Sequence, residues 1–378
     1  MLGLVDPSAA TLACLRLTLT PQIGAMIGHR LIDAAGSALE LWQMDATAWR
    51  AIEGVGPKLA RALCEAAAQD VTPILEECHR HNITIVGLED VGYPAALAAC
   101  EDAPLVLFMR GDPAALTHSR LLAVVGARRA SREGMAIARR WSEAWSQQQV
   151  AIVSGMAQGI DSAAHGGSLK GSAPGIAVLG CGLLQANSVT QQRQIAALCD
   201  QNGEQGGGCV ISEFSPQISA RAEYFPRRNR IIAGLALATV VIEADLRSGS
   251  LITARRALGY GRGLFAVPGS VLHDGHRGCH HLIRQGEAEL AESPQQVMDA
   301  LGWQRSVVPS GSEHQAATTN PVEIAICQAL RREILHIDAL SEVCGLTVPK
   351  LSPALLALEL QGVIERLPGS RYTLSHPS

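Results

Sequence analysis

Short continuous runs of hydrophobic residues recur along the middle of the chain, and most of them end at a glycine or a short polar turn. The runs are Thr84–Leu88, Leu105–Met109, Leu121–Val125, Val150–Val153, Ile176–Leu179, Val210–Phe214, Thr239–Glu243 and Leu264–Val267. Their length and their lack of polar alternation are typical of strands covered on both faces. Segments with helical spacing separate most of them, as in Arg132–Gln147 and Thr190–Asp200. This alternation predicts an α/β fold with a doubly wound, mostly parallel sheet.

The first 70 residues follow a different pattern, with Ala and Leu at helical spacing around two glycine-centred turns, Pro21–Gly24 and Gly54–Lys58. Apolar residues on both sides of the second turn resemble a helix-hairpin-helix motif, in which backbone N–H groups point at a phosphate. A plain turn in a small helical bundle explains the same spacing, and the first turn has no basic residue beside it. Both interpretations stay open.

The last part of the chain begins after a polar, Ser- and Thr-rich stretch, residues 304–320, which is typical of a linker. Three helices are predicted beyond it, followed by two strands around Pro368-Gly369: the helices are Val322–Arg331, Ile337–Cys344 and Val348–Gln361, and the strands are Gly362–Arg366 and Arg371–Leu374. This order is typical of a winged-helix domain, which binds DNA or protein. The third helix has Lys350 as its only basic residue, so docking to a protein remains open beside reading of a DNA groove.

Composition narrows the class of protein. The 378 residues are 47% hydrophobic and 17% charged, as in a globular protein, and the longest apolar run, Ile231–Ile242, is far shorter than a membrane span. The first residues carry no basic segment typical of a secretion signal, so a cytoplasmic protein is expected. Ten scattered cysteines without a CxxC pair indicate neither a disulfide framework nor a zinc site, and no metal is expected.

Four turns follow predicted strands or open helices. Three of them contain glycine and serine, namely Gly126–Ser131, Ser154–Gly159 and Arg247–Ser250, and the fourth is the arginine-rich Phe225–Arg230. Small residues at a strand-to-helix turn expose backbone N–H groups that bind anions. Because the carboxyl ends of parallel strands share one edge of a sheet, the turns are expected to converge there.

Local charge points to a polyanion, although the whole chain has a formal net charge of −4. Residues 120–140 contain six arginines against one acid, and residues 221–262 contain eight against three. Aromatic residues lie in or beside the second segment, and Phe225 is the best candidate for stacking, since Phe214 and Phe265 belong to predicted strands. Arginines interleaved with aromatic rings suit single-stranded nucleic acid.

A catalytic constellation is not evident. The chain lacks a GxSxG elbow, a Walker lysine and an HExxH motif. Asp161 and His165 are spaced to face each other on a helix, as an acid/base pair would be, but an Asp that caps the helix with a His packed behind it is the favoured explanation of the spacing.

Five ordered motifs between Val124 and Gly286 resemble the DNA-processing protein A (DprA/Smf) family. They read VVGARRASREG, SGMAQGIDSAAH, FPRRNRIIAGL, EADLRSGSLITAR and FAVPGS. The beginning of the chain is similar to the family's SAM-like helix-hairpin-helix domain and its end to the family's winged-helix domain. The resemblance therefore implies a helical domain over residues 1–75, an extended Rossmann-like domain over 76–303, a linker over 304–320 and a winged-helix domain over 321–378.

The resemblance also implies a function. Members of this family bind and protect single-stranded DNA entering during natural transformation and load the RecA recombinase past single-strand-binding protein, so a homodimer without catalysis and without a cofactor is expected. Carried over by motif, Arg128 binds a phosphate, Gly155 and the turn Ser248-Gly249-Ser250 line the pocket, and stacking and charge come from Phe225, Arg228, Asn229 and Arg230. Gly126 and Ser154, from the first two motifs, complete the candidate DNA-binding set.

Two departures from the family pattern stand out. Where the family has GLDxxYP, this chain has Gly182–Val189 without the acid, the ring and the proline, so we expect this loop to contact DNA weakly or differently. His280 stands where an asparagine is usual in GCNxLI.

Enzymes provide the competing interpretations. A phosphoribohydrolase-like nucleotide enzyme would carry a PGGxGTxxE run, but the corresponding strand end reads Glu243–Ser250. A dinucleotide-dependent oxidoreductase would carry GxGxxG after a strand, with an acid about 20 residues on, and no strand here leads into one.

Overall fold

The computed structural model describes residues 7–186, 188–200, 207–303, 321–330, 335–360, 364–367 and 371–374. The chain divides into two compact units, residues 1–306 and 307–378. The predicted linker, 304–320, lies outside the described residues. The domain boundary near residue 75 stays a prediction.

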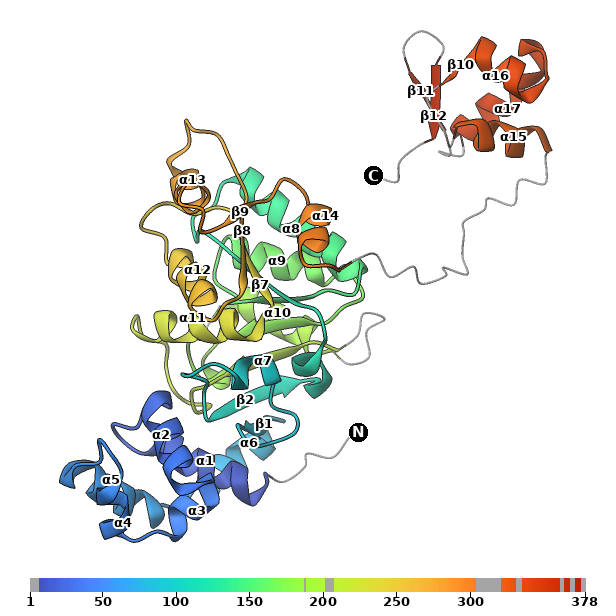
Figure 1. Cartoon of the computed structure of the whole chain (residues 1–378). Coiled ribbons are helices and arrows are strands. Elements are labelled where there is room, and N and C mark those ends of the chain that lie inside the picture. The colour runs from blue at the N-terminus through green and yellow to red at the C-terminus, as the bar shows by residue number, and fades with distance from the viewer. Residues whose placement is uncertain are drawn as a thin grey trace. The chain divides into compact units, whose positions relative to one another are not determined.

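A nine-stranded sheet forms the centre of the first unit, in the order β1-β2-β6-β5-β4-β3-β7-β8-β9 (Figure 1). The strands are β1 (Thr84–Gly87), β2 (Val106–Gly111), β3 (Leu121–Val125), β4 (Ala151–Ser154), β5 (Gly175–Val178), β6 (Cys209–Ser212), β7 (Ala238–Val241), β8 (Gly263–Ala266) and β9 (Glu289–Leu290). Neighbours from β6 through β9 pair in parallel, whereas β2 pairs antiparallel with both β1 and β6. The mostly parallel sheet is confirmed, and β9 was not predicted.

The order of the strands reverses between β3 and β7. From β3 the chain moves outward through β4, β5 and β6, then returns to place β7 on the other side of β3, where Val125 pairs with Val241. The connections on the two sides of this point leave in opposite directions, which opens a crevice at the carboxyl ends of the two strands.

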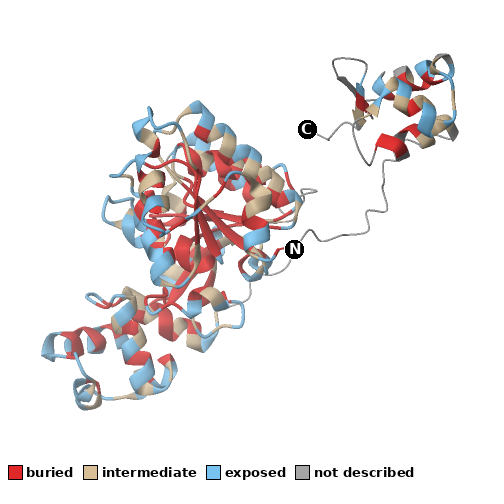
Figure 2. Cartoon of the chain, turned by 45° about the horizontal axis from the view of Figure 1, so that its top comes forward, coloured by how far each residue is buried: buried red, intermediate tan, exposed pale blue. Residues whose placement is uncertain are grey.

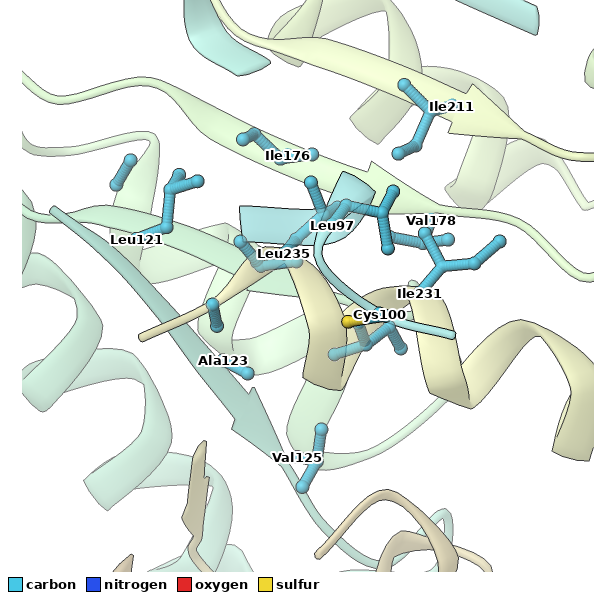
Figure 3. Packing of buried hydrophobic residues seen from close by; sticks show 14 of the residues in the cluster. Leu97, Cys100, Leu121, Ala123, Val125, Ile176, Val178, Ile211, Ile231 and Leu235 are labelled. Carbon is cyan, nitrogen blue, oxygen red and sulfur yellow. The ribbon is translucent and has the colours of Figure 1, made fainter. Parts of the chain in front are cut away.

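Alternate residues of each strand face different helical layers. Leu121, Ala123 and Val125 of β3 pack in one core with residues of α7 (Ala95–Ala98), α11 (Tyr224–Leu235), α12 (Ser250–Gly259) and α13 (Arg277–Arg284), part of which Figure 3 shows. Leu122 and Val124 pack in a second core with residues of α8 (Arg132–Gln147), α9 (Ile160–Ser168) and α14 (Pro294–Ala300). The strands are therefore buried on both faces, as the apolar runs predicted (Figure 2).

Six helices precede the sheet: α1 (Ala9–Leu19), α2 (Ala25–Ala35), α3 (Ala38–Gln43), α4 (Ala46–Ala51), α5 (Pro57–Ala67) and α6 (Thr72–Arg80). They share a third core with Phe108 of β2, Val210 of β6 and helix α10 (Val189–Leu198). The second glycine-centred turn joins α4 to α5, and Gly54 within it has a φ of +83°, which favours glycine. No described helix is both long enough and apolar enough to cross a membrane.

The second unit consists of α15 (Pro321–Leu330), β10 (Leu335–His336), α16 (Ile337–Cys344), α17 (Val348–Leu360), β11 (Ile364–Leu367) and β12 (Arg371–Leu374). The strands form an antiparallel sheet in the order β10-β12-β11. Leu340, Leu355 and Tyr372 belong to its own core. Three helices and a β-hairpin confirm the predicted winged helix, while the short strand β10 was not predicted.

Candidate nucleic-acid interface

A cleft of about 640 Å³ opens at the crevice between β3 and β7. The turns after these two strands and the first turns of α11 and α12 form its walls. Eight of the eleven candidate DNA-binding residues line it: Gly126, Arg128, Phe225, Arg228, Asn229, Ser248, Gly249 and Ser250. The predicted convergence of the turns is thus seen for all four, because Ala157, in the turn after β4, also lines the cleft.

An exposed arginine covers an aromatic ring at this cleft. The guanidinium carbon of Arg128 lies 4.7 Å from the ring centroid of Phe225, within the range of a cation–π interaction. Phe225 itself packs closely on Gly180, where a Cβ atom would lie 3.0 Å from the ring. Arg128 forms no ion pair with any residue that the structure describes. Its charge is therefore available to a phosphate.

Arg228 lies deeper, with only 3% of its surface exposed. Its Nη1 donates to the main-chain oxygens of Gly155, at 2.5 Å, and of Val178. Burial lowers the pKa of Arg228 to about 10, and the charge of Asp161 acts in the opposite direction. A Cβ atom at Gly155 would collide with this guanidinium, so the glycine is needed for the close approach.

The backbone amides of two glycine turns face an internal carboxylate. Burial raises the pKa of Asp161, at the start of α9, while the positive charge of Arg228 and hydrogen bonds from the backbone N–H groups of Ala157, Gly155 and Gly126 lower it. We had expected the amides of Gly126 and Gly155 to be free for a phosphate, and the structure differs because they lie near enough to Asp161 to act on its pKa. This carboxylate is 35 residues beyond Gly126 in the sequence, so the sequence pattern gave no sign of the contact.

His165, one turn beyond Asp161, is fully buried. Burial lowers its pKa to about 4, so the ring is neutral at pH 7. His165 is absent from the residues that line the cleft. Its position supports the interpretation of a histidine packed behind a helix start rather than that of an acid/base pair.

The start of α12 faces the cleft. Ser248 Oγ and Ser250 Oγ are 2.7 Å apart, and a Cβ atom at Gly249 would meet nothing within 4 Å. The Nδ2 atom of Asn229 donates to the main-chain oxygen of Gly249 over 3.3 Å, which connects α11 to this turn. A ten-residue helix that begins in an open, glycine-containing turn offers backbone N–H groups and a positive dipole end to an anion.

Glu243 follows β7, and its carboxylate forms hydrogen bonds within the protein. Its carboxylate accepts from the backbone N–H of Ser131, at 3.0 Å, and from Ser131 Oγ, at 2.6 Å. Ser131 caps the first turn of α8 through Gly134. Glu243 therefore fixes the beginning of α8 at the edge of the cleft.

Three candidate residues do not line the cleft: Ser154, Gly155 and Arg230. Ser154 is buried and donates to the main-chain oxygen of Val124 over 2.6 Å. Arg230 is two positions beyond Arg228 on α11 and so faces another side of the helix. Its Nη2 lies 2.5 Å from Glu213 Oε2, and its Nη1 donates to the main-chain oxygen of Asp102. The structure therefore places Arg230 in a buried ion pair, away from the cleft where we had expected its charge.

Other cleft residues were absent from our candidate set. Arg129, Arg247 and Asp245 all line the cleft and are exposed. All three stand in the family motifs, close to residues of the candidate set. Extending the candidate set to every polar residue of the same turns would have found them.

None of the described residues of the unusual loop 182–189 lines the cleft. Gln185 in its 3-10 turn, η2 (Leu183–Gln185), donates instead to Gln217 over 3.1 Å.

Comparison with known proteins agrees with this architecture. The family described as "DNA recombination-mediator protein A" matches residues 84–302. The chain belongs to this family. A second family, the "DprA winged helix domain", matches residues 310–370. The resemblance drawn from the five motifs is thereby confirmed.

Individual family members are similar in sequence to this chain over most of their own length. Protein Smf of Escherichia coli (strain K12) is 38% identical over 305 residues, which cover 79% of each chain. DNA processing protein DprA of Streptococcus pneumoniae (strain ATCC BAA-255 / R6) is 42% identical over 206 residues, 54% of this chain and 70% of that protein.

Solved structures of family members share the fold. The X-ray structure of DprA from Streptococcus pneumoniae superposes with a TM-score of 0.65 at 30% identity, covering 78% of this chain and 98% of that one. The structure of DprA from Helicobacter pylori, reported for its single-stranded DNA binding mode, gives a TM-score of 0.50 at 25% identity, covering 57% and 95%.

Proposed function

We propose that this recombination-mediator protein binds single-stranded DNA in the cleft between β3 and β7. The observation that carries the proposal is the combination, in one cleft, of the exposed arginines Arg128, Arg129 and Arg247 with the ring of Phe225. Cations that follow a phosphate backbone beside a ring that stacks on bases are what sequence-tolerant single-strand binding requires. The single-strand binding described for the Helicobacter pylori relative supports the same assignment.

Each part of the cleft then has a physical role. Arg128 forms a charge-assisted contact with a phosphate, and a base stacks on Phe225. The turn Ser248-Gly249-Ser250 offers backbone N–H groups to a second phosphate. Arg228 has a mainly structural role, because its hydrogen bonds to Gly155 and Val178 hold the ends of β4 and β5 together. Its positive charge lies at the floor of the cleft.

We further propose that the protein works by binding, without catalysis or a cofactor. As a homodimer, it loads a RecA-type recombinase onto incoming single strands past single-strand-binding protein during natural transformation. These steps rest on family membership. The division into domains 1–75, 76–303 and 321–378 belongs to the same proposal.

The test is fluorescence anisotropy of the full chain on a labelled single-stranded oligonucleotide and on its duplex, across a salt series. We expect preference for the single strand and a linear fall of log affinity with log salt. Equal or absent binding would overturn the proposal and turn attention to a small-nucleotide ligand, sought by thermal stabilisation.

The recombinase step has its own test. RecA ATPase activity is measured on single strands precoated with single-strand-binding protein, with and without this protein. Faster onset of ATP hydrolysis is expected, and an unchanged onset despite tight DNA binding would contradict the loading step alone.

A further inference from the structure

Asp245 is an unusual feature of a cleft that is otherwise suited to a polyanion. The cleft contains three carboxylates, those of Asp161, Glu243 and Asp245. The first two are buried: the positive charge of Arg228 and nearby backbone N–H groups act to lower the pKa of Asp161, and the carboxylate of Glu243 accepts from Ser131 Oγ. Asp245 is exposed, and among the residues that the structure describes no side chain or backbone N–H donates to its carboxylate.

A free carboxylate at this place opposes phosphate binding, because like charges repel each other. Its useful partner is therefore a hydrogen-bond donor on the ligand. The phosphates and deoxyriboses inside a DNA strand offer no N–H or O–H donor, whereas the bases do. The donor must belong to a base.

The position of Asp245 relative to Phe225 allows this. Both side chains line the same cleft, whose volume of about 640 Å³ is in the range of small-molecule sites. The turn that follows Asp245 is closed by a hydrogen bond from the Ser248 N–H to the Asp245 main-chain oxygen, 2.9 Å, and is linked to α11 through Asn229 and Gly249. The ring and the carboxylate are thus carried by two segments that are held together.

Bases differ in what they offer a carboxylate. In a single strand the Watson–Crick edge is open. Guanine presents N1–H and N2–H side by side, matching the two carboxylate oxygens, and such bidentate charge-assisted pairs are strong. Cytosine and adenine offer one exocyclic amino group. Thymine offers a single N3–H between two carbonyl oxygens, which the carboxylate repels.

We propose that Asp245 reads the edge of a base held in the cleft and makes the protein favour guanine over thymine at that position. The inference deepens the proposed function and rests on it: Phe225 and the arginines bind any single strand, and Asp245 adds a preference. Specificity arises partly from the penalty imposed on the wrong base, since thymine leaves the carboxylate unpaired.

The experiment compares the full chain with Asp245→Asn on short oligo-dT that carries one central substitution, dG, deoxyinosine, dC or dA. A single guanine avoids four-stranded structures, and inosine keeps N1–H but lacks the N2 amino group. By anisotropy competition we expect the unaltered protein to bind the dG oligonucleotide about 5- to 10-fold more tightly than plain oligo-dT, in the lower part of the range for bidentate base pairs. Inosine is expected to fall between the two.

In Asp245→Asn the preference for dG should largely disappear, while affinity for plain oligo-dT should rise because one repulsive charge is gone. The matched control is Glu223→Gln, which removes an exposed carboxylate beside the start of α11 that does not line the cleft. It should keep the full preference.

Two results would overturn the inference while leaving the proposed function intact: equal affinity of the unaltered protein for dG and dT oligonucleotides, or an undiminished dG preference in Asp245→Asn. Failure of the unaltered protein to bind any single strand would overturn the proposed function and this inference with it.

Discussion

Two arginine-rich regions border the cleft, and they differ in whether their guanidinium groups are exposed or buried. In the turn between β3 and α8, Arg128 and Arg129 are exposed and form no ion pair with any described residue. On α11, Arg228 and Arg230 are 3% and 5% exposed and are occupied by backbone carbonyls and by Glu213. Both regions appear in the sequence as arginines next to small or aromatic residues. The local density of arginine therefore does not measure how much positive charge a surface offers to DNA.

The difference follows from what lies around each region. Helix α11 packs on the sheet, so arginines on its inner sides need acceptors there and find Gly155, Val178, Asp102 and Glu213. The β3–α8 turn projects from the edge of the sheet, where water solvates an unpaired guanidinium at little cost. Buried arginines hold the framework, and exposed ones remain for a ligand.

The largest effect should come from Arg230→Met. This change leaves Glu213, whose side chain is 4% exposed, without its buried partner, and breaking such a pair costs about 3–5 kcal/mol of the free energy of unfolding. Urea denaturation measures it. The matched control is Arg227→Met, because Arg227 reaches the same Glu213 oxygen at 3.0 Å from a side chain that is 45% exposed, and it should cost less than about 1 kcal/mol. Normal stability combined with lost DNA affinity in Arg230→Met would show that this arginine belongs with the exposed group.

Arg128→Ala should leave folding intact and weaken single-strand binding by about 1.5–3 kcal/mol, the size of a charge-assisted contact. The slope of log affinity against log salt should fall by about 0.7, as expected for one phosphate contact on a single strand. Arg193→Ala, an exposed arginine of α10 that does not line the cleft, serves as the control. Unchanged affinity of a folded Arg128→Ala protein would remove this residue from the interface.

Phe225→Leu should have the smallest effect, about 1 kcal/mol of binding free energy, because leucine keeps apolar contact but cannot stack on a base. The salt slope should not change, since no charge is lost. Anisotropy at several salt concentrations separates this outcome from the alternative. A reduced slope would mean that the ring acts by supporting Arg128, whose guanidinium lies over it.

Much of the fold was predictable, because its signals are local. Each apolar run between Thr84 and Val267 became a strand, with bounds that differ by at most two residues from the predicted ones. The two strands that were missed, β9 and β10, have two residues each, too few for any hydrophobic pattern, and they exist only through pairing with β8 and β12. The sequence also predicted which turns form the candidate site, because β3, β7 and the helix starts that meet at the cleft all carry recognisable motifs.

The sequence alone determined the alternation of buried strands and helices, the turns at the strand ends and the family to which the chain belongs, since these depend on spacing and on residues adjacent in the chain. The tertiary structure decided which charges face the cleft. The amides of Gly126 and Gly155 lie near Asp161, and Arg230 pairs with Glu213. Asp245 has no hydrogen-bond donor to its carboxylate among the residues that the structure describes. The reason is physical: whether a polar group is free depends on its burial and on acceptors or donors from distant segments, and only the packed sheet and its helices bring those together.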